Sequence, residues 1–247
     1  MPAVSESKYV VQAGWQHAPH LTEEDKRKQL AATPPFLRAA RSEGTPSLGA
    51  GAIYPIPPEN YICQPFALPT HWRRAYGLDV GWNKTAAIWG AIDGDTDTVY
   101  LYSEHYVGQE KPLIHASAIK ARGEWIPGVI DPAARGRSQE DGERLLFQYQ
   151  NHGLNLTLAN NSVESGIYAV WERLETGCLK VFSTLTNWLA EARLYRRDEN
   201  GKIVKKFDHA QDATRYLIVS GLKRAIVRPV NDTVSAQQVV ADGRGGY

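Results

Sequence analysis

The chain has 247 residues, of which 43% are hydrophobic and 10% aromatic, and its formal net charge is +1. These values are typical of one globular domain with extensions, or at most two small domains. No apolar run reaches the roughly 18 residues that cross a bilayer, and residues 1–8 lack a basic-then-apolar signal pattern. We therefore expect a cytoplasmic protein with no membrane partner. Cys63 and Cys178 lie far apart, which argues against a disulfide framework and a cysteine-rich zinc site.

The charge balance also limits how the chain could bind nucleic acid. A domain that binds DNA tightly by itself is usually more basic than a net charge of +1. We therefore predict weak or transient contact with DNA, or a second domain that supplies the affinity. The balance does not exclude an enzyme that acts on DNA, because acidic metal ligands would offset its basic groups.

The ends of the chain differ in composition from its middle. Residues 1–70 hold many of the 14 prolines and are predicted to form an extended arm. Within the arm, Thr22 is a candidate N-cap for a short helix that ends near residue 32, and residues 49–58 are expected to be extended. Residues 230–247 are predicted to be a flexible polar tail. The folded domain is thus expected at residues 71–229.

The middle of the chain contains both strand-like and helix-like patterns. Apolar and alternating runs bounded by glycine, proline or acidic turns predict strands at residues 74–80, 85–92, 98–107, 127–131, 154–159 and 179–183. Apolar residues at helical spacing predict helices at residues 111–122, 138–151, 162–175, 186–197 and 208–224.

The order of these elements predicts the fold class. The first three strands are joined by tight turns, which indicates an antiparallel meander. The later strands alternate with helices, which indicates parallel strands joined by crossover helices. The sequence therefore predicts an α/β domain with a mixed sheet, an antiparallel meander plus parallel strands, flanked by helices.

Three aspartates stand where such a fold would bring them together. Asp79 lies near the end of the first strand, between two glycines, and Asp131 ends the fourth strand. Ligand-binding side chains gather at the carboxyl ends of strands in such sheets. Asp212 lies near the start of the last helix, where Asp208 and His209 share its face.

Converging carboxylates suit a particular chemistry. Hard divalent cations such as Mg²⁺ and Mn²⁺ prefer oxygen ligands. A pair of such ions about 4 Å apart activates water and stabilises the leaving oxygen in phosphodiester hydrolysis. We therefore predict a two-ion site whose ligands are Asp79, Asp131 and Asp212, with Asp208 as a further candidate.

Each acid also has a purely structural interpretation. An aspartate at a strand end is often a turn or cap residue, and Asp208 fits the N-cap of the last helix. Asp212 fits a solvated helix position. Glu104, in the third strand, is a candidate fourth ligand that equally fits an ordinary surface position.

Several of these segments resemble one family. Residues 208–216, Asp-His-Ala-Gln-Asp-Ala-Thr-Arg-Tyr, resemble the late Asp-His-x-x-Asp-Ala-x-Arg-Tyr motif of the nuclease in phage terminase large subunits. Residues 77–81 resemble its first-strand motif, and residues 129–133 its second-carboxylate strand. Residues 191–205 resemble the segment before its last helix, and residues 49–55 the linker from the packaging ATPase. The resemblance covers residues 15–228, and its motifs are specific in combination.

The resemblance implies a ribonuclease H-like fold and cleavage of concatemeric viral double-stranded DNA during genome packaging, with Mg²⁺ or Mn²⁺ as two-ion cofactor. It implies that Asp79, Asp131 and Asp212 bind the ions and that His209 orients a ligand or water. It also implies a motor with an ATPase domain, a small terminase subunit and a portal, in the cytoplasm of an infected host. The chain contains no G-x-x-x-x-G-K-[ST] phosphate-binding loop, so we expect it to correspond to the nuclease half alone.

Basic residues on either side of the acids are candidate phosphate contacts. They are Lys84, Arg135, Arg137, Arg196, Arg197, Lys205 and Lys206. Such a charge run is also typical of a solvated face. No aromatic residues interleave with these basic groups, so we expect little sequence preference.

Two other classes of function stay open at this point. The first is another ribonuclease H-like enzyme, such as a junction resolvase or a transposase-like nuclease, and a resolvase would prefer four-way junctions. The second is a non-catalytic adaptor that docks on a partner, which would bind no divalent metal.

Overall fold

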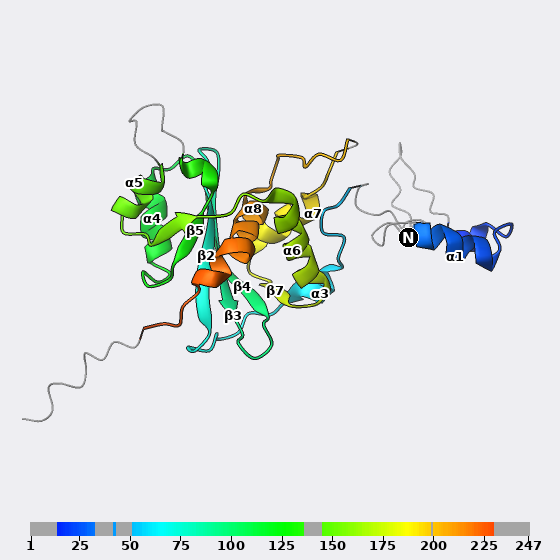
Figure 1. Cartoon of the computed structure of the whole chain (residues 1–247), viewed down its shortest axis with the longest axis horizontal. Coiled ribbons are helices and arrows are strands. Elements are labelled where there is room, and N and C mark those ends of the chain that lie inside the picture. Colours follow the sequence, from blue (N-terminus) through cyan, green and yellow to red (C-terminus); the bar gives the residue numbers. More distant parts are fainter. Residues whose placement is uncertain (1–13, 33–41, 43–50, 136–144, 199, 230–247) are drawn as a thin grey trace, which may run out of the picture.

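The computed structural model describes residues 14–32, 42, 51–135, 145–198 and 200–229 (Figure 1). Its strands are β1 (Ile62–Cys63), β2 (Arg73–Asp79), β3 (Thr85–Ile92), β4 (Val99–Val107), β5 (Gly128–Ile130), β6 (Leu156–Leu158) and β7 (Leu179–Phe182). Its α-helices are α1 (Glu23–Ala32), α3 (Pro58–Tyr61), α4 (Pro112–Lys120), α5 (Leu145–Asn151), α6 (Val163–Glu175), α7 (Thr186–Leu194) and α8 (His209–Tyr216). Within these ranges, no helix has the length and apolar character needed to span a membrane.

The strands form one mixed sheet in the order β1-β7-β4-β3-β2-β5-β6. Strands β2, β3 and β4 form the antiparallel meander, while β5 and β6 continue the sheet beside β2 in parallel. Strand β7 lies parallel to β4, and β1 lies parallel to β7. The predicted α/β fold is confirmed, with a mixed sheet of an antiparallel meander plus parallel strands.

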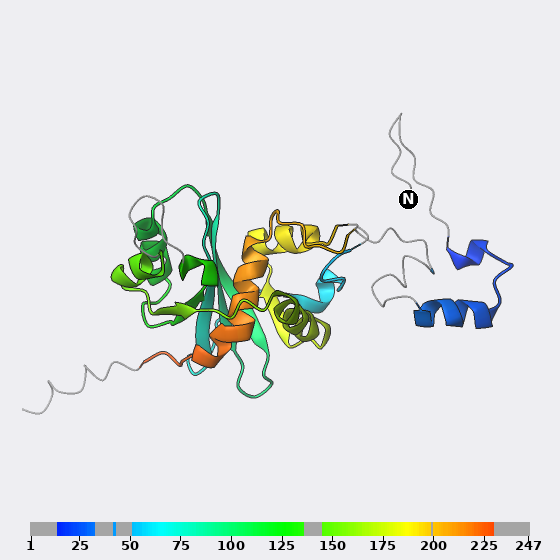
Figure 2. The ribbon, with the colours of Figure 1, turned by 45° about the horizontal axis from the view of Figure 1, so that its top comes forward.

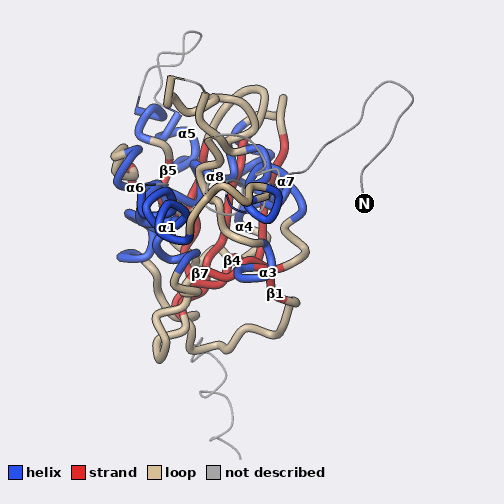
Figure 3. Tube along the Cα trace, turned by 90° about the vertical axis from the view of Figure 1, so that its right-hand side faces the viewer, coloured by secondary structure: helices blue, strands red, loops and turns tan. Residues whose placement is uncertain are grey.

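The sheet separates two hydrophobic cores, and alternate residues of its central strands point into each. In β3, Ala86 and Ile88 belong to the core that contains residues of α6, α7 and α8. Ala87 and Trp89 belong to the core that contains residues of α4 and α5. This alternation places helices on both faces of the sheet, with the strands between them (Figure 3).

Helix α8 lies directly against the centre of the sheet (Figures 1 and 2). A Cβ on Gly77 of β2 would stand 2.0 Å from the carbonyl oxygen of Ala213, so only glycine permits this approach. A Cβ on Gly77 and the side chain of Asp79 point to the same face, because successive strand residues alternate. The close contact therefore places α8 beside the carboxylate that ends β2.

The expected helix near the start of the chain is present as α1. The Thr22 hydroxyl accepts a bond from the Asp25 backbone amide at 3.2 Å, and the Thr22 backbone amide donates to Asp25 Oδ2 at 3.3 Å. This reciprocal arrangement is a capping box, which fixes the first turn of the helix.

The predicted boundary at residue 70 is wrong for the described part of the arm. Helix α3 and strand β1 lie before it, and β1 pairs with β7 through Ile62 and Val181. Ile53 and Tyr61 are buried in the core of the α6 face. The folded domain therefore begins before residue 71, and short proline-flanked segments join it because the sheet edge and α6 bury their apolar side chains. The predicted tail at residues 230–247 lies outside the described residues.

Two predicted helices differ from the structure at their carboxyl ends. Helix α7 ends at Leu194 rather than near residue 197, because the backbone of Tyr195 and Arg197 pairs with Ile53 and Gly51 instead. After α8 the chain continues as a π-helical turn, Leu217–Gly221, and a 3-10 turn, Leu222–Arg224. The π segment is rich in β-branched, serine and glycine residues, which are weak α-helix formers.

The other predicted strands and helices are present with small shifts of their ends. The predicted helix at residues 138–151 is described only from residue 145 onward, because residues 138–144 lie outside the described residues. Its second half is α5.

Replacing Gly77 by alanine should destabilise the fold, because the new methyl group would overlap the α8 backbone. We expect the free energy of unfolding in urea to fall by about 2–3 kcal/mol, as for an overpacked core position. Gly94→Ala is the matched control, since a Cβ at Gly94 has no atom within 4 Å. Equal stability of the two variants would contradict the proposed packing constraint.

Candidate metal centre

The carboxyl ends of β2 and β5 place two aspartates on neighbouring strands. Leu78 of β2 pairs with Ile130 of β5 in parallel register. The pairing continues one residue further, where the Asp131 amide donates to the Leu78 carbonyl at 2.9 Å. Asp79 and Asp131 thus follow directly after paired residues on adjacent strands, as the sequence predicted.

Helix α8 connects to both strand ends through its side chains. His209 Nδ1 lies 2.9 Å from Asp79 Oδ2. About two turns further along α8, the Tyr216 hydroxyl donates to Asp131 Oδ1 at 3.1 Å. Asp212 lies between His209 and Tyr216 on the same helix and is buried. The structure therefore brings Asp79, Asp131, Asp212 and His209 together at one end of the sheet.

Two basic side chains form ion pairs with Asp212. The Arg215 guanidinium donates to Asp212 Oδ1 from Nε at 3.2 Å and from Nη2 at 3.1 Å. The Lys205 ammonium lies 3.2 Å from Asp212 Oδ2 and 3.2 Å from Asp208 Oδ2. Lys205, predicted as a phosphate contact, thus stands between the two acids, where a bound cation would compete with it.

Burial dominates the electrostatics of Asp79. Burial raises the pKa of its carboxyl to about 6 from 3.8, although the hydrogen bond with His209 opposes the rise. The charges of Asp212 and Asp131 raise it further. The hydrogen bond with Asp79 raises the pKa of His209 in turn. Mutual repulsion of buried carboxylates is the expected result when acids converge with no bound cation.

The donors present suit a hard divalent cation. Asp208 Oδ2 is buried and has no hydrogen-bond partner, and its close neighbour is the Lys205 ammonium. Within the described residues, no three His, Cys, Asp or Glu side chains already stand in a metal-binding arrangement. His209, Lys205 and Arg215 contact the acids instead. The carboxylate oxygens are of the type that Mg²⁺ and Mn²⁺ prefer, and a cation would replace the contacts that these basic groups now supply.

Asp208 does not cap α8, although its sequence position fits an N-cap. Its side chain makes no capping hydrogen bond. Glu191 of α7 takes that role, because its Oε2 accepts the Ala210 amide at 2.6 Å and the Gln211 amide at 3.4 Å. The capping interpretation of Asp208 is therefore wrong, and its carboxylate is left facing Lys205.

Glu191 is a positioning residue that sequence reasoning missed as a site component. Its Oε1 accepts a hydrogen bond from the Tyr106 hydroxyl of β4 at 2.6 Å. Burial raises the pKa of the Glu191 carboxyl, while the hydrogen bonds from Tyr106 and Ala210 oppose the rise. An acid on another helix has no local capping spacing, so only the tertiary contact of α7 with α8 shows its role.

Glu104 caps a helix as well, and both of its carboxylate oxygens accept hydrogen bonds there. Its Oε1 accepts bonds from the Asn187 amide at 3.0 Å and from the Asn187 side chain at 2.8 Å. Its Oε2 accepts the Trp188 amide at 2.9 Å. Both oxygens thus satisfy free donors at the start of α7, which argues against the metal-ligand and the plain surface interpretations alike.

The predicted basic residues fall into different environments. The Lys84 ammonium lies 5.2 Å from the ring centre of Tyr106, whose ring also contacts His209. Lys206 is exposed and lies over Phe207. Both lie close in sequence or space to the candidate centre.

Arg196 and Arg197 have other neighbours. Arg197 forms an ion pair with Glu164 of α6 and donates to the Gly201 carbonyl, and Arg196 is exposed beside the bridge to Ala52. Arg135 ends a short 3-10 turn (Pro132–Arg135), and Arg137 lies outside the described residues.

The sheet order and the acids at its strand ends define a ribonuclease H-like domain with a candidate metal centre. A family model described as the terminase RNaseH-like domain matches residues 76–220, which include Asp79, Asp131 and Asp212. The chain belongs to this family. The resemblance inferred from its motifs is thereby confirmed.

Known proteins show the same relationship. The chain is 37% identical over 223 residues to the large terminase subunit of Salmonella phage P22, covering 86% of this chain and 44% of that protein. It spans less than half the length of the curated relatives it matches.

Solved structures agree. The nuclease domain of the P22 large terminase matches with a TM-score of 0.66 and 35% identity, over 73% of this chain and 96% of that one. The nuclease domain of the bacteriophage SPP1 large terminase, solved with bound Mn, has a TM-score of 0.50 and 19% identity, over 65% of this chain and 96% of that one. At that identity, the second match concerns the fold alone.

Replacing Asp79 by asparagine should stabilise the metal-free protein above pH 6. The folded state holds the Asp79 proton up to a pH of about 6, against 3.8 ordinarily, so stability falls as pH rises between these values. Asparagine stays neutral and escapes this loss, which should be worth about 2 kcal/mol at pH 8. Urea unfolding with a chelator from pH 4 to pH 8 measures it. Asp95→Asn, on the exposed β3–β4 turn, should follow the wild type, and a parallel curve for Asp79→Asn would contradict the assignment.

Replacing Glu191 by alanine should loosen the start of α8. Loss of a buried cap should lower the free energy of unfolding by about 2 kcal/mol and speed hydrogen exchange at the Ala210 amide. Glu191→Gln, which keeps one acceptor oxygen, should lie between alanine and wild type. Glu172→Ala, on α6, is the control, and unchanged exchange at Ala210 in Glu191→Ala would refute the positioning role.

Proposed function

We propose that the chain is a metal-dependent endonuclease domain that cleaves concatemeric double-stranded viral DNA during genome packaging, with little sequence preference. The observation that carries the proposal is the joining of α8 to two strand ends, through His209 to Asp79 and Tyr216 to Asp131. Membership of the terminase RNaseH-like family and the P22 nuclease-domain match support it.

Mg²⁺ or Mn²⁺ fits the carboxylates as cofactor, and the SPP1 relative with bound Mn supports that choice. Asp79 and Asp131 would hold one ion, and Asp212, with Asp208 beside it, would hold a second. When bound, such a pair supplies Lewis acidity to the attacking water and to the leaving 3′ oxygen of the phosphodiester.

The protein's own side chains prepare these acids. The bond from His209 holds one oxygen of Asp79, and the Tyr216 hydroxyl holds one oxygen of Asp131. Arg215 fixes Oδ1 of Asp212 and leaves Oδ2 to the more exposed Lys205. Lys205 would move away when a cation binds, which leaves its charge beside the phosphate. Ordered neighbours of this kind orient ligands and tune their affinity.

The wider assignment follows from the relatives. The chain spans less than half of their length, so we propose that an ATPase domain, joined through the N-terminal arm, completes the full protein. A small terminase subunit and a portal would be its partners, in the cytoplasm of an infected bacterium.

Removing any one of the three central acids should abolish cutting. We expect Asp79→Ala, Asp131→Ala and Asp212→Ala to reduce nicking of plasmid DNA with Mn²⁺ at least about 100-fold, since each loses an ion ligand. Asp95→Ala is the control. Ca²⁺ should bind without supporting turnover, because its coordination is larger and more flexible. If Asp79→Ala still cuts DNA, the assignment of Asp79 as an ion ligand is wrong.

The same assay separates the alternatives. Faster cutting of four-way junctions than of linear duplex would favour a resolvase-like enzyme. No Mn²⁺ binding by calorimetry at millimolar concentration, with no cutting, would favour a non-catalytic docking domain.

A further inference from the structure

An exposed tryptophan stands beside the candidate metal centre. Trp82 lies in the turn between β2 and β3, three residues after Asp79, and 69% of it is exposed. That is the largest exposed fraction among the large hydrophobic residues noted as exposed in the described part of the chain. Tryptophan is enriched at contact surfaces, because its ring combines a large apolar area with a polar N–H group.

The turn that carries Trp82 is held in one shape. The Gln109 amide donates to the Trp82 carbonyl at 2.7 Å, and the Thr85 hydroxyl donates to the Gly81 carbonyl at 3.1 Å. A Cβ on Gly108 would stand 1.8 Å from the Asn83 carbonyl oxygen, so the turn packs on a site that only glycine fits. The indole is therefore presented by a rigid loop, and binding it would cost little ordering.

Trp82 and Asp131 line the same cleft, which has a volume of about 820 Å³. Its walls combine apolar groups, such as Leu113 and Tyr149, with the polar side chains of Lys111 and His152. Apart from Asp131, Glu110 is its one carboxylate among the described lining residues. The cleft thus runs from a candidate ion ligand to an aromatic platform.

We propose that this cleft binds an unpaired nucleotide of the DNA strand, next to the phosphate to be cut, with its base stacked on Trp82. The proposal rests on the proposed nuclease function and names a subsite for its substrate. Continuity with Asp131 favours a nucleotide over a protein segment, since the phosphate of that nucleotide would lie at the acids. Stacking accepts every base, which agrees with the expected lack of sequence preference.

The nearby basic side chain of Lys84 lies outside the cleft, on the face of the sheet that carries α8. It follows Trp82 in the same turn, and its ammonium lies over the Tyr106 ring near His209. Lys84 could therefore contact the phosphate at the acids, but not the base in the cleft. Stacking on Trp82 requires an unpaired base, so the strand would be unpaired at least over the nucleotide that enters the cleft.

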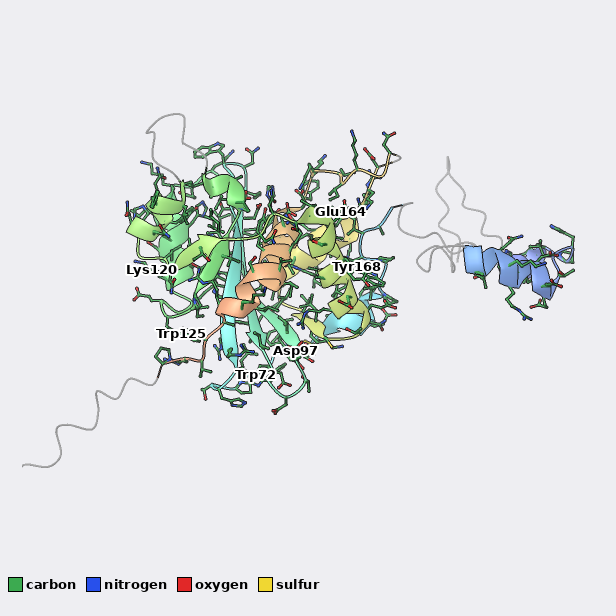
Figure 4. All side chains as sticks on the ribbon, in the orientation of Figure 1. Trp72, Asp97, Lys120, Trp125, Glu164 and Tyr168 are labelled. Atoms are coloured by element: carbon green, nitrogen blue, oxygen red, sulfur yellow. The ribbon has the colours of Figure 1, made fainter. Side chains whose placement is uncertain are left out.

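The test compares Trp82→Ala and Trp82→Phe with a matched control. Tyr168→Ala removes another exposed aromatic, 59% exposed, on α6 beside Glu164 (Figure 4). Fluorescence anisotropy with a labelled single-stranded oligonucleotide at low salt, and Ca²⁺ in place of Mn²⁺, measures affinity without turnover. We expect Trp82→Ala to weaken binding about tenfold, Trp82→Phe less than about threefold, and Tyr168→Ala not at all. Urea unfolding checks that the variants remain folded.

Cutting with Mn²⁺ provides the second measurement. In Trp82→Ala, we expect KM for DNA to rise about tenfold with kcat nearly unchanged, and a mismatched duplex to lose its advantage over a paired one. If Trp82→Ala binds and cuts like Tyr168→Ala, the subsite is overturned while the nuclease stands. If Trp82-dependent binding is seen but the wild type does not cut, the nuclease proposal fails and the subsite stands. Absence of DNA binding by the wild type overturns the subsite, and the indole would then be a contact for a protein partner.

Discussion

The contact of helix α8 with strand β2 at Gly77 determines the rest of the site. With a Cβ the strand would meet the Ala213 carbonyl at 2.0 Å, so a larger residue would push the helix away. At the present distance, one helix reaches two adjacent strand ends, His209 touching Asp79 and Tyr216 touching Asp131. A shift of about 1 Å in a helix is enough to break such hydrogen bonds, whose lengths fall within a few tenths of an ångström. A backbone constraint in the core therefore becomes a constraint on side chains at the surface.

The negative charges of the acids brought together in this way require basic partners. Buried carboxylates are costly unless they are paired, which explains why Lys205 and Arg215 contact Asp212, and why the pKa of Asp79 rises to about 6. A second set of carboxylates, away from these acids, stabilises the elements that carry them. Glu104 of β4 caps α7, and Glu191 of α7 caps α8. Two interactions thus fix the position of α8. One is its close packing against Gly77, and the other is the cap from Glu191, whose helix α7 is itself capped by Glu104.

Much of this arrangement could be predicted from the sequence, because its signals are local. Alternation and turn residues gave the strands, and the three aspartates stand at element ends where a mixed sheet gathers them. The missing parts are those that depend on distant residues. β1 is only two residues long and is defined by its pairing with β7, and the end of α7 is set by pairing with residues 51–53. Asp208 has the sequence position of a cap, yet the Glu191 carboxylate reaches the first amides of α8 from another helix. Local propensity cannot reveal such a competitor.

The net charge of +1 takes on a structural meaning once the basic residues are located. Arg173 is paired with Asp97, Arg197 with Glu164, and Lys205 with the acids of the centre. These positive charges are therefore largely compensated by acids of the same domain. Arg224 likewise binds the Gly128 carbonyl and Asn155. A chain whose net charge is only +1 has little long-range attraction for a phosphate backbone. Its affinity for DNA must then come from short-range contacts or from a neighbouring domain. The exposed indole of Trp82, in a cleft shared with Asp131, is a contact of the first kind, because stacking requires no net charge and acts only at short range.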